Sequence, residues 1–109
     1  MGNLNVSVAA ATAVVGYDLF RDLVNQTVPY PRRLTKIGVQ GSAAALDTEI
    51  ELFIGTESRG TWYNTGTGAV TNDAMIDIDE YVPANARISA KVRDAPATNP
   101  INVTVITQP

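Results

Sequence analysis

The chain has 109 residues, a net charge of −3, and neither cysteine nor histidine. The lack of cysteine excludes disulfides, thiolate nucleophiles and cysteine-ligated zinc, and the lack of histidine removes the usual general base and the commonest transition-metal ligand. The weak negative charge argues against direct binding of nucleic acid, because phosphate contacts require a concentrated basic surface.

The first expected strand lies in residues 3–12, where Leu4, Val6 and Val8 alternate with asparagine and serine. Such alternation is typical of antiparallel strands with one buried face. It recurs in residues 48–55, 75–81, 86–94 and 100–108, with turn-forming glycine, proline and asparagine between the stretches. We therefore predict an all-β fold: one domain over residues 1–109, formed as a single antiparallel β-sandwich of about seven to eight short strands. A jelly-roll-like topology is expected, with an immunoglobulin-like one as the alternative.

Residues 17–25 are compatible with two local structures. A short helix would bring four residues to one face, because they recur at the spacing of helical turns: Tyr17, Phe20, Leu23 and Val24. A strand would instead align Tyr17, Leu19, Arg21 and Leu23 on one side. Both alternatives stay open, and neither changes the fold class. Tyr17 and Phe20 are candidate contact residues in either case, since aromatic side chains dominate interface energetics.

The stretch PYPRRLTK, residues 29–36, contains two prolines, which favour extended or irregular backbone over helix. It also holds the main group of basic residues, Arg32, Arg33 and Lys36, beside Tyr30. Two interpretations are open: a docking arm that contacts a neighbouring subunit, or a loop that crosses one end of the sandwich. Three cations would support only weak phosphate contact.

The stretch GTESRGTWYNTGTG, residues 55–68, contains the only tryptophan, Trp62, next to Tyr63. Exposed aromatic side chains with hydrogen-bonding neighbours suit a sugar face or a protein contact, and Arg59 and Asn64 would complete such a site. The alternative is a hairpin in which Trp62 packs against the edge of the sandwich. The glycines do not form a phosphate-binding loop, because the G-x-x-x-x-G-K-[ST] order is absent.

The densest acidic cluster is Asp77, Asp79 and Glu80. A calcium site would need several oxygen ligands converging from a loop, and a glycoside hydrolase would need one carboxyl group with a raised pKa. Alternation instead places Asp77 and Asp79 on one strand face, opposite Ile76 and Ile78. We therefore expect no metal site but a solvated face. Its charges would pair, across the sheet or a subunit boundary, with basic residues of the next strand: Arg87, Lys91 and Arg93.

Residues 75–108, MIDIDEYVPANARISAKVRDAPATNPINVTVITQ, combine a strand leading into VPANARI, a basic strand, a loop and a final alternating strand. This organisation resembles the closing strands of small jelly-roll capsid, spike or decoration proteins of phages. The resemblance implies a structural role in the virion and assembly into symmetric oligomers, often trimers, on the capsid shell. It transfers no catalytic residue.

We therefore expect a bacteriophage structural protein rather than an enzyme: a capsid decoration (cement) or minor capsid protein, located in the virion. Its partners would be further copies of itself and the major capsid protein or other virion proteins. No catalytic, cofactor or metal site is expected, and no membrane contact, because no apolar run approaches the length of a membrane span. The candidate interface residues are Tyr17, Phe20, Tyr30, Arg32, Arg33, Trp62 and Tyr63. The alternative function is a carbohydrate- or receptor-binding β-sandwich module.

Overall fold

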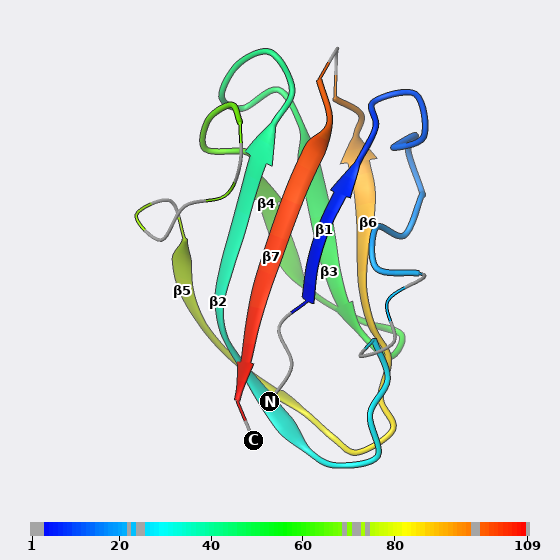
Figure 1. Cartoon of the computed structure of the whole chain (residues 1–109). Coiled ribbons are helices and arrows are strands. Elements are labelled where there is room, and N and C mark those ends of the chain that lie inside the picture. Colours follow the sequence, from blue (N-terminus) through cyan, green and yellow to red (C-terminus); the bar gives the residue numbers. More distant parts are fainter. Residues whose placement is uncertain are drawn as a thin grey trace.

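The computed structural model describes residues 4–21, 23, 26–68, 70, 73, 75–96 and 99–108. These residues form seven antiparallel strands in two sheets (Figure 1). The strands are β1 (Leu4–Val8), β2 (Arg32–Gly41), β3 (Glu49–Ile54), β4 (Glu57–Tyr63), β5 (Ile76–Val82), β6 (Ile88–Asp94) and β7 (Ile101–Gln108). One sheet has the order β1-β7-β2-β5 and the other the order β4-β3-β6. The predicted all-β, sandwich-like class is confirmed, and no helix in the described part of the chain is long and apolar enough to cross a membrane.

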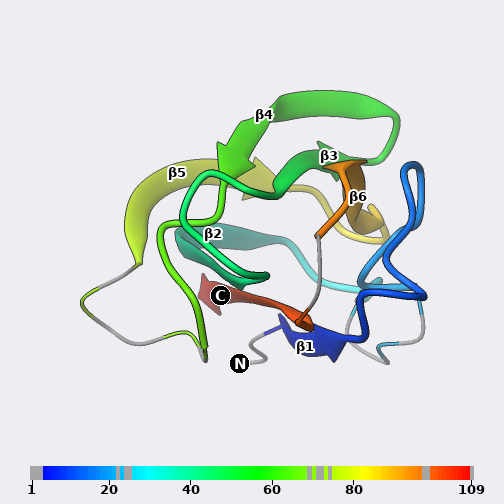
Figure 2. The ribbon, with the colours of Figure 1, turned by 90° about the horizontal axis from the view of Figure 1, so that it is seen from above.

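The two sheets lie face to face, as the view from above shows (Figure 2), and the core fills the space between them. Strand β7 shows how alternate residues enter this core: Ile101, Val103 and Val105 are fully buried, while the residues between them are partly exposed. The inward-facing residues of β3 and β6 that alternation predicted are also buried: Ile50, Leu52, Ile54, Ile88, Ala90 and Val92. Alternation therefore identified the core correctly in β3, β6 and β7, but not in β5, where Ile76 is 42% exposed and Ile78 is only half-buried.

Strand β2 is the longest strand and lies inside its sheet between β7 and β5, yet the sequence pattern did not predict it. Two features of this strand obscure the alternation of buried and exposed residues. In the pairing with β7, a register shift between Leu34 and Lys36 inserts an extra residue into β2, so that the buried Leu34 and Ile37 are three positions apart instead of two. Gly38, on the outer face, is covered by Val70 and Met75, which removes the polar side of the pattern. The prolines precede the strand, and the chain crosses the lower end of the sandwich just before Arg32 (Figure 1).

Strand β4 also lies where loop was expected. It forms a hairpin with β3, in which Ile54 pairs with Glu57 across the two-residue turn Gly55–Thr56. Gly55 has φ +64°, as the first central position of a type II′ turn requires. Because β4 is an edge strand with mostly exposed side chains, its sequence lacks the alternation that burial imposes.

The described residues between Gly16 and Thr27 lie along the outer edge of β6 without forming a regular strand. The Gly16 N–H donates to the Val92 carbonyl at 2.8 Å, and the Leu19 N–H donates to the Ala90 carbonyl at 2.8 Å. Isolated bridges join Asp18 to Lys91 and Thr27 to Arg87. The helix considered for residues 17–25 is wrong for the described residues, which form turns held against β6; Asp22, Val24 and Asn25 lie outside the described residues.

Candidate interaction surface

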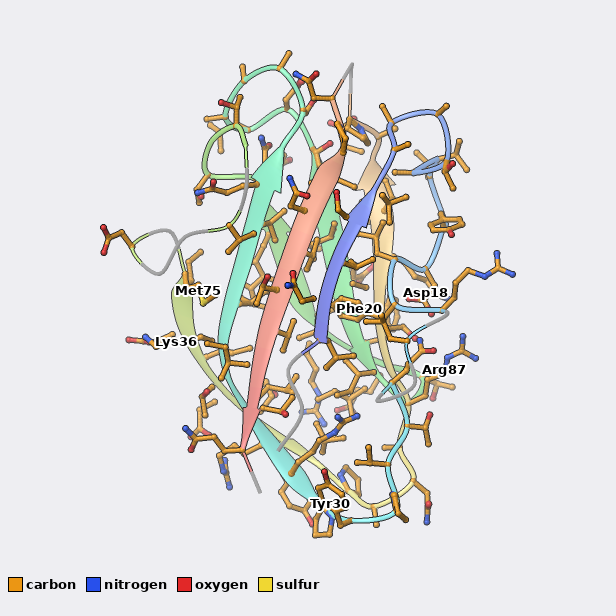
Figure 3. The ribbon with its side chains drawn as sticks, viewed as in Figure 1. Asp18, Phe20, Tyr30, Lys36, Met75 and Arg87 are labelled. Atoms are coloured by element: carbon orange, nitrogen blue, oxygen red, sulfur yellow. The ribbon has the colours of Figure 1, made fainter. Side chains whose placement is uncertain are left out.

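The acidic residues of β5 are paired, but with a different strand from the expected one. β5 pairs with β2, so Asp77 accepts from Lys36 at 2.6 Å and Asp79 accepts from Arg33 at 2.5 Å. The pairing expected with Arg87, Lys91 and Arg93 is wrong within the chain, because β5 and β6 follow one another in sequence but belong to different sheets. Figure 3 shows Lys36 on the β5 side of β2 and Arg87 on the opposite flank of the molecule.

The basic residues expected to meet β5 have other partners. Arg87 pairs with Asp18 at 3.2 Å, and Arg93 pairs with Glu51 at 2.6 Å. The Lys91 ammonium lies 5.1 Å from the centre of the Phe53 ring. A hydrogen bond from the Ser58 hydroxyl, reinforced by Arg93, lowers the pKa of the Glu51 carboxyl. In the described residues no group of three or more histidine, cysteine, aspartate or glutamate side chains could hold a metal ion.

Two of the seven candidate interface residues are interior. Phe20, labelled in Figure 3, is fully buried and belongs to the hydrophobic core. Arg32 is 3% exposed and donates from Nη2 to the Gln26 carbonyl at 3.0 Å. Burial lowers the pKa of its guanidinium. Neither side chain is therefore available on the surface of the isolated chain. Arg32 is the first residue of β2, and it faces inward on the same side as Val82, the buried residue with which it pairs.

The other five candidates retain some exposure but do not form one site. Tyr30 and Arg33 are exposed at the lower end of the sandwich, where Figure 3 labels Tyr30. Tyr17 is half-buried on the flank formed by residues 16–27, with the Arg21 guanidinium 5.6 Å from the centre of its ring. Trp62 is half-buried and packs against the core, and Tyr63 is exposed.

The carbohydrate site considered for residues 59–64 is not assembled. Trp62 pairs with the buried Ile50 and faces inward, whereas Tyr63 pairs with Glu49 and faces outward. Arg59 is engaged by Glu57 at 2.9 Å and by Glu80 at 3.3 Å. Asn64, which was expected beside the aromatic pair, is fully buried. The packing of Trp62 against the sandwich edge, weighed as the alternative, is what the structure has.

Asn64 organises the loops at the upper end of the sandwich. Its Oδ1 accepts from the backbone N–H groups of Asp47 and Thr48 at 2.8 and 2.9 Å. Its Nδ2 donates to the carbonyls of Gly41, Ala44 and Gly66. The only signal of this role in the sequence is an asparagine next to turn residues, a pattern too common to single it out.

An exposed apolar loop was missed by the sequence interpretation. Val14 and Val15 are 55% and 66% exposed and lie between two open depressions of about 500 and 470 Å³. We call this area the valine-loop surface: Val14, Val15, Gly16, Tyr17, Asp18, Arg21 and Arg87 line the first depression, and Val15, Gly16, Glu51, Phe53, Lys91, Val92 and Arg93 line the second. An apolar centre with a rim of charged residues is the usual anatomy of a protein contact.

A different hollow lies on the outer face of the β1-β7-β2-β5 sheet. It has a volume of about 330 Å³ and is lined by Asn5, Val6, Ser7, Val70, Asn102 and Thr104. None of these side chains is charged. Asn102 donates to the Gly68 carbonyl at 2.8 Å, and Thr104 donates to the Asn5 side chain at 2.9 Å. The Thr104 and Asn5 side chains therefore hold each other in place in the hollow, and a backbone carbonyl holds the amide of Asn102.

No protein-family model, curated protein or solved structure matches this chain. What it does is therefore inferred from its own residues and their arrangement.

Proposed function

We propose that the chain is a virion structural protein, a capsid decoration or minor capsid protein. It acts by self-association and by binding a capsid lattice, through surface contact rather than catalysis. The observation that carries the proposal is the connectivity of the strands. If residues 16–27 are counted as the second of eight positions, the two layers have the orders 1-8-3-6 and 2-7-4-5. This order supports a jelly-roll topology, an architecture common among viral capsid domains and also found in lectins.

The valine-loop surface supports the lattice-binding part of the proposal. Two adjacent valines more than half exposed cost solvation free energy in the isolated chain, and a partner that covers them removes that cost. Arg21, Arg87, Lys91 and Arg93 line the depressions on either side, where they can orient a partner without being buried.

The deciding experiment is mass spectrometry of purified particles, followed by co-sedimentation of the purified chain with particles that lack it. We expect the chain in the particles and stoichiometric co-sedimentation. The double variant Val14→Asp/Val15→Asp should lose most of the binding, and Thr56→Asp, which adds a charge at the exposed β3–β4 turn, should not. Absence of the chain from particles, together with no co-sedimentation, would refute the proposal.

A second candidate is a carbohydrate- or receptor-binding module, and one observation favours it. The uncharged hollow lined by Asn5, Ser7, Asn102 and Thr104 presents the amide and hydroxyl groups that hydrogen-bond to sugars. On a glycan array, binding that is lost in Asn102→Ala and kept in Tyr63→Ala would support this function at the hollow. The absence of binding to every glycan would reject it.

A further inference from the structure

The sheet edges of this molecule differ sharply in how they are protected. A free edge presents unpaired backbone N–H and C=O groups, and soluble proteins cover such edges or interrupt them with charges and bulges. Four strands stand at the ends of the two sheets: β1 and β5 in one, β4 and β6 in the other. Their comparison shows which edge is left open for pairing.

The two edges of the β4-β3-β6 sheet are both protected. The outer edge of β6 is occupied by the described residues between Gly16 and Thr27, through the backbone hydrogen bonds described above. Strand β4 contains a bulge between its pairings with Leu52 and Phe53, and Gly60 within it has φ +126°. Glu57 and Arg59 add charge to this strand, so regular pairing with another strand is disfavoured.

The β5 edge is protected by charge. Asp77 and Asp79 project outward from it, and Glu80 forms an ion pair with Arg59 of β4 at 3.3 Å. A second copy of β5 would bring these carboxylates close to their counterparts, and like charges directly opposite one another are destabilising.

Strand β1 has none of the protective features found at the other three edges. Its sequence, Leu-Asn-Val-Ser-Val, contains no charged residue, no proline and no glycine, and its register with β7 runs without a shift. In the part of the chain that the structure describes, the backbone of β1 pairs only with β7. Val6, at the centre of the strand, remains half-exposed, whereas Leu4 and Val8 on either side are buried.

We propose that β1 pairs with β1 of a second copy, antiparallel across a two-fold axis at Val6. This inference rests on the proposed self-association and names its contact. The strand fits itself: Val6 meets Val6, Leu4 meets Val8 of the second copy, and Asn5 meets Ser7. All five residues then find a partner, apolar facing apolar and polar facing polar, with no charge opposed to a like charge. If the two-fold axis lay between two residues instead of at Val6, apolar residues of one copy would lie opposite polar residues of the other.

The two four-stranded sheets would join into one continuous sheet across the axis. A five-residue edge is only about 17 Å long, well short of a standard interface, so the dissociation constant should be weak, on the order of 0.1 mM. On a particle the local concentration of copies is far higher than in dilute solution, and weak pairing suffices there.

Charged substitutions at positions 5 and 7 test whether β1 is the contact between the two copies and whether its pairing has the proposed register. The residues Asn5 and Ser7 face outward and would lie opposite each other across the axis. In Asn5→Lys/Ser7→Lys each introduced lysine would meet another lysine, and in Asn5→Lys/Ser7→Glu each would meet a glutamate. Both variants lose the same hydrogen bond between Thr104 and Asn5, so they are matched for effects within one chain.

Sedimentation velocity of the three proteins, from about 10 µM to about 1 mM, gives the dimer fraction around the expected constant. Circular dichroism confirms equal folding. We expect dimerisation of the wild type and of the lysine–glutamate variant, with at least a tenfold weaker association of the double-lysine variant, and this effect should shrink in high salt.

Three results would overturn the pairing. Equal association of all three proteins would show that β1 is not the contact, while self-association itself would stand. Loss of association in both variants would reject the register across the two-fold axis. A wild type that stays monomeric to the highest concentration would reject the pairing, and capsid binding would then be judged separately by co-sedimentation.

Discussion

The substitution Asn64→Ala should destabilise the protein strongly, although Asn64 lies in a loop. The fully buried amide accepts from two backbone N–H groups and donates to three carbonyls. Each buried polar group left without a partner costs about 1–3 kcal/mol. The Thr48 N–H and the Gly41 carbonyl belong to buried residues, so two such groups suffice for a loss of about 3 kcal/mol. Ser42 and Leu46, both at positive φ, belong to the same loop, whose backbone groups at Gly41, Ala44, Asp47 and Thr48 would lose their bonds to the amide.

A domain of this size has a total stability of roughly 5–15 kcal/mol, so this loss is large. Urea unfolding followed by the fluorescence of Trp62 would measure it, and the melting temperature should fall by about 15 °C. The matched control is Thr67→Ala, an exposed position in the adjoining loop, which should change stability by less than about 0.5 kcal/mol. A loss below about 1 kcal/mol for Asn64→Ala would refute the idea that this amide holds the loops together.

Three further substitutions test the fold and its electrostatics. Phe20→Ala should cost about 3–5 kcal/mol in urea unfolding, because it empties a fully buried site between the sheets. Gly41→Ala should prevent folding, since a Cβ there would lie 2.2 Å from the Pro100 carbonyl oxygen, whereas Gly66→Ala, with open space around it, should be tolerated. The lowered pKa of Glu51 stabilises the folded state above pH 4.5, and this contribution is lost as the pH falls through the folded-state pKa. Glu51→Gln should therefore reduce the acid sensitivity measured in thermal melts between pH 6 and pH 3.

The sequence predicted strands where burial is one-sided and regular. In β3, β6 and β7 the side chains of alternate residues enter the core, and the period of two is visible without knowledge of the fold. It failed at β2 because a bulge shifts the period and because Val70 and Met75 cover the outer face at Gly38. The alternation failed to predict β4 because most side chains of this edge strand are exposed, so that neither face requires apolar residues.

Which strands are neighbours was harder to predict than where the strands lie. The acidic and basic strands are joined by a short turn, and a hairpin closed by that turn would have placed Asp79 opposite Lys91 and Asp77 opposite Arg93. The chain instead crosses from one sheet to the other between β5 and β6. The local sequence indicates which side chains of a strand face the core, but it does not indicate to which sheet the strand belongs. The charge pairing therefore follows only from the three-dimensional arrangement.

The cationic side chains are all engaged within the chain, which bears on how it can recognise a partner. Each of the eight cationic side chains has an internal partner. Arg33, Lys36, Arg59, Arg87 and Arg93 form ion pairs; Arg32 donates to a carbonyl, and Arg21 and Lys91 lie over aromatic rings. Exposed pairs of this kind add at most about 1 kcal/mol each to stability, and they weaken any long-range field. The main contact must then come from the uncharged groups that remain open, the two exposed valines of the valine-loop surface and the β1 edge, while the paired charges around the valines only help to orient the partner.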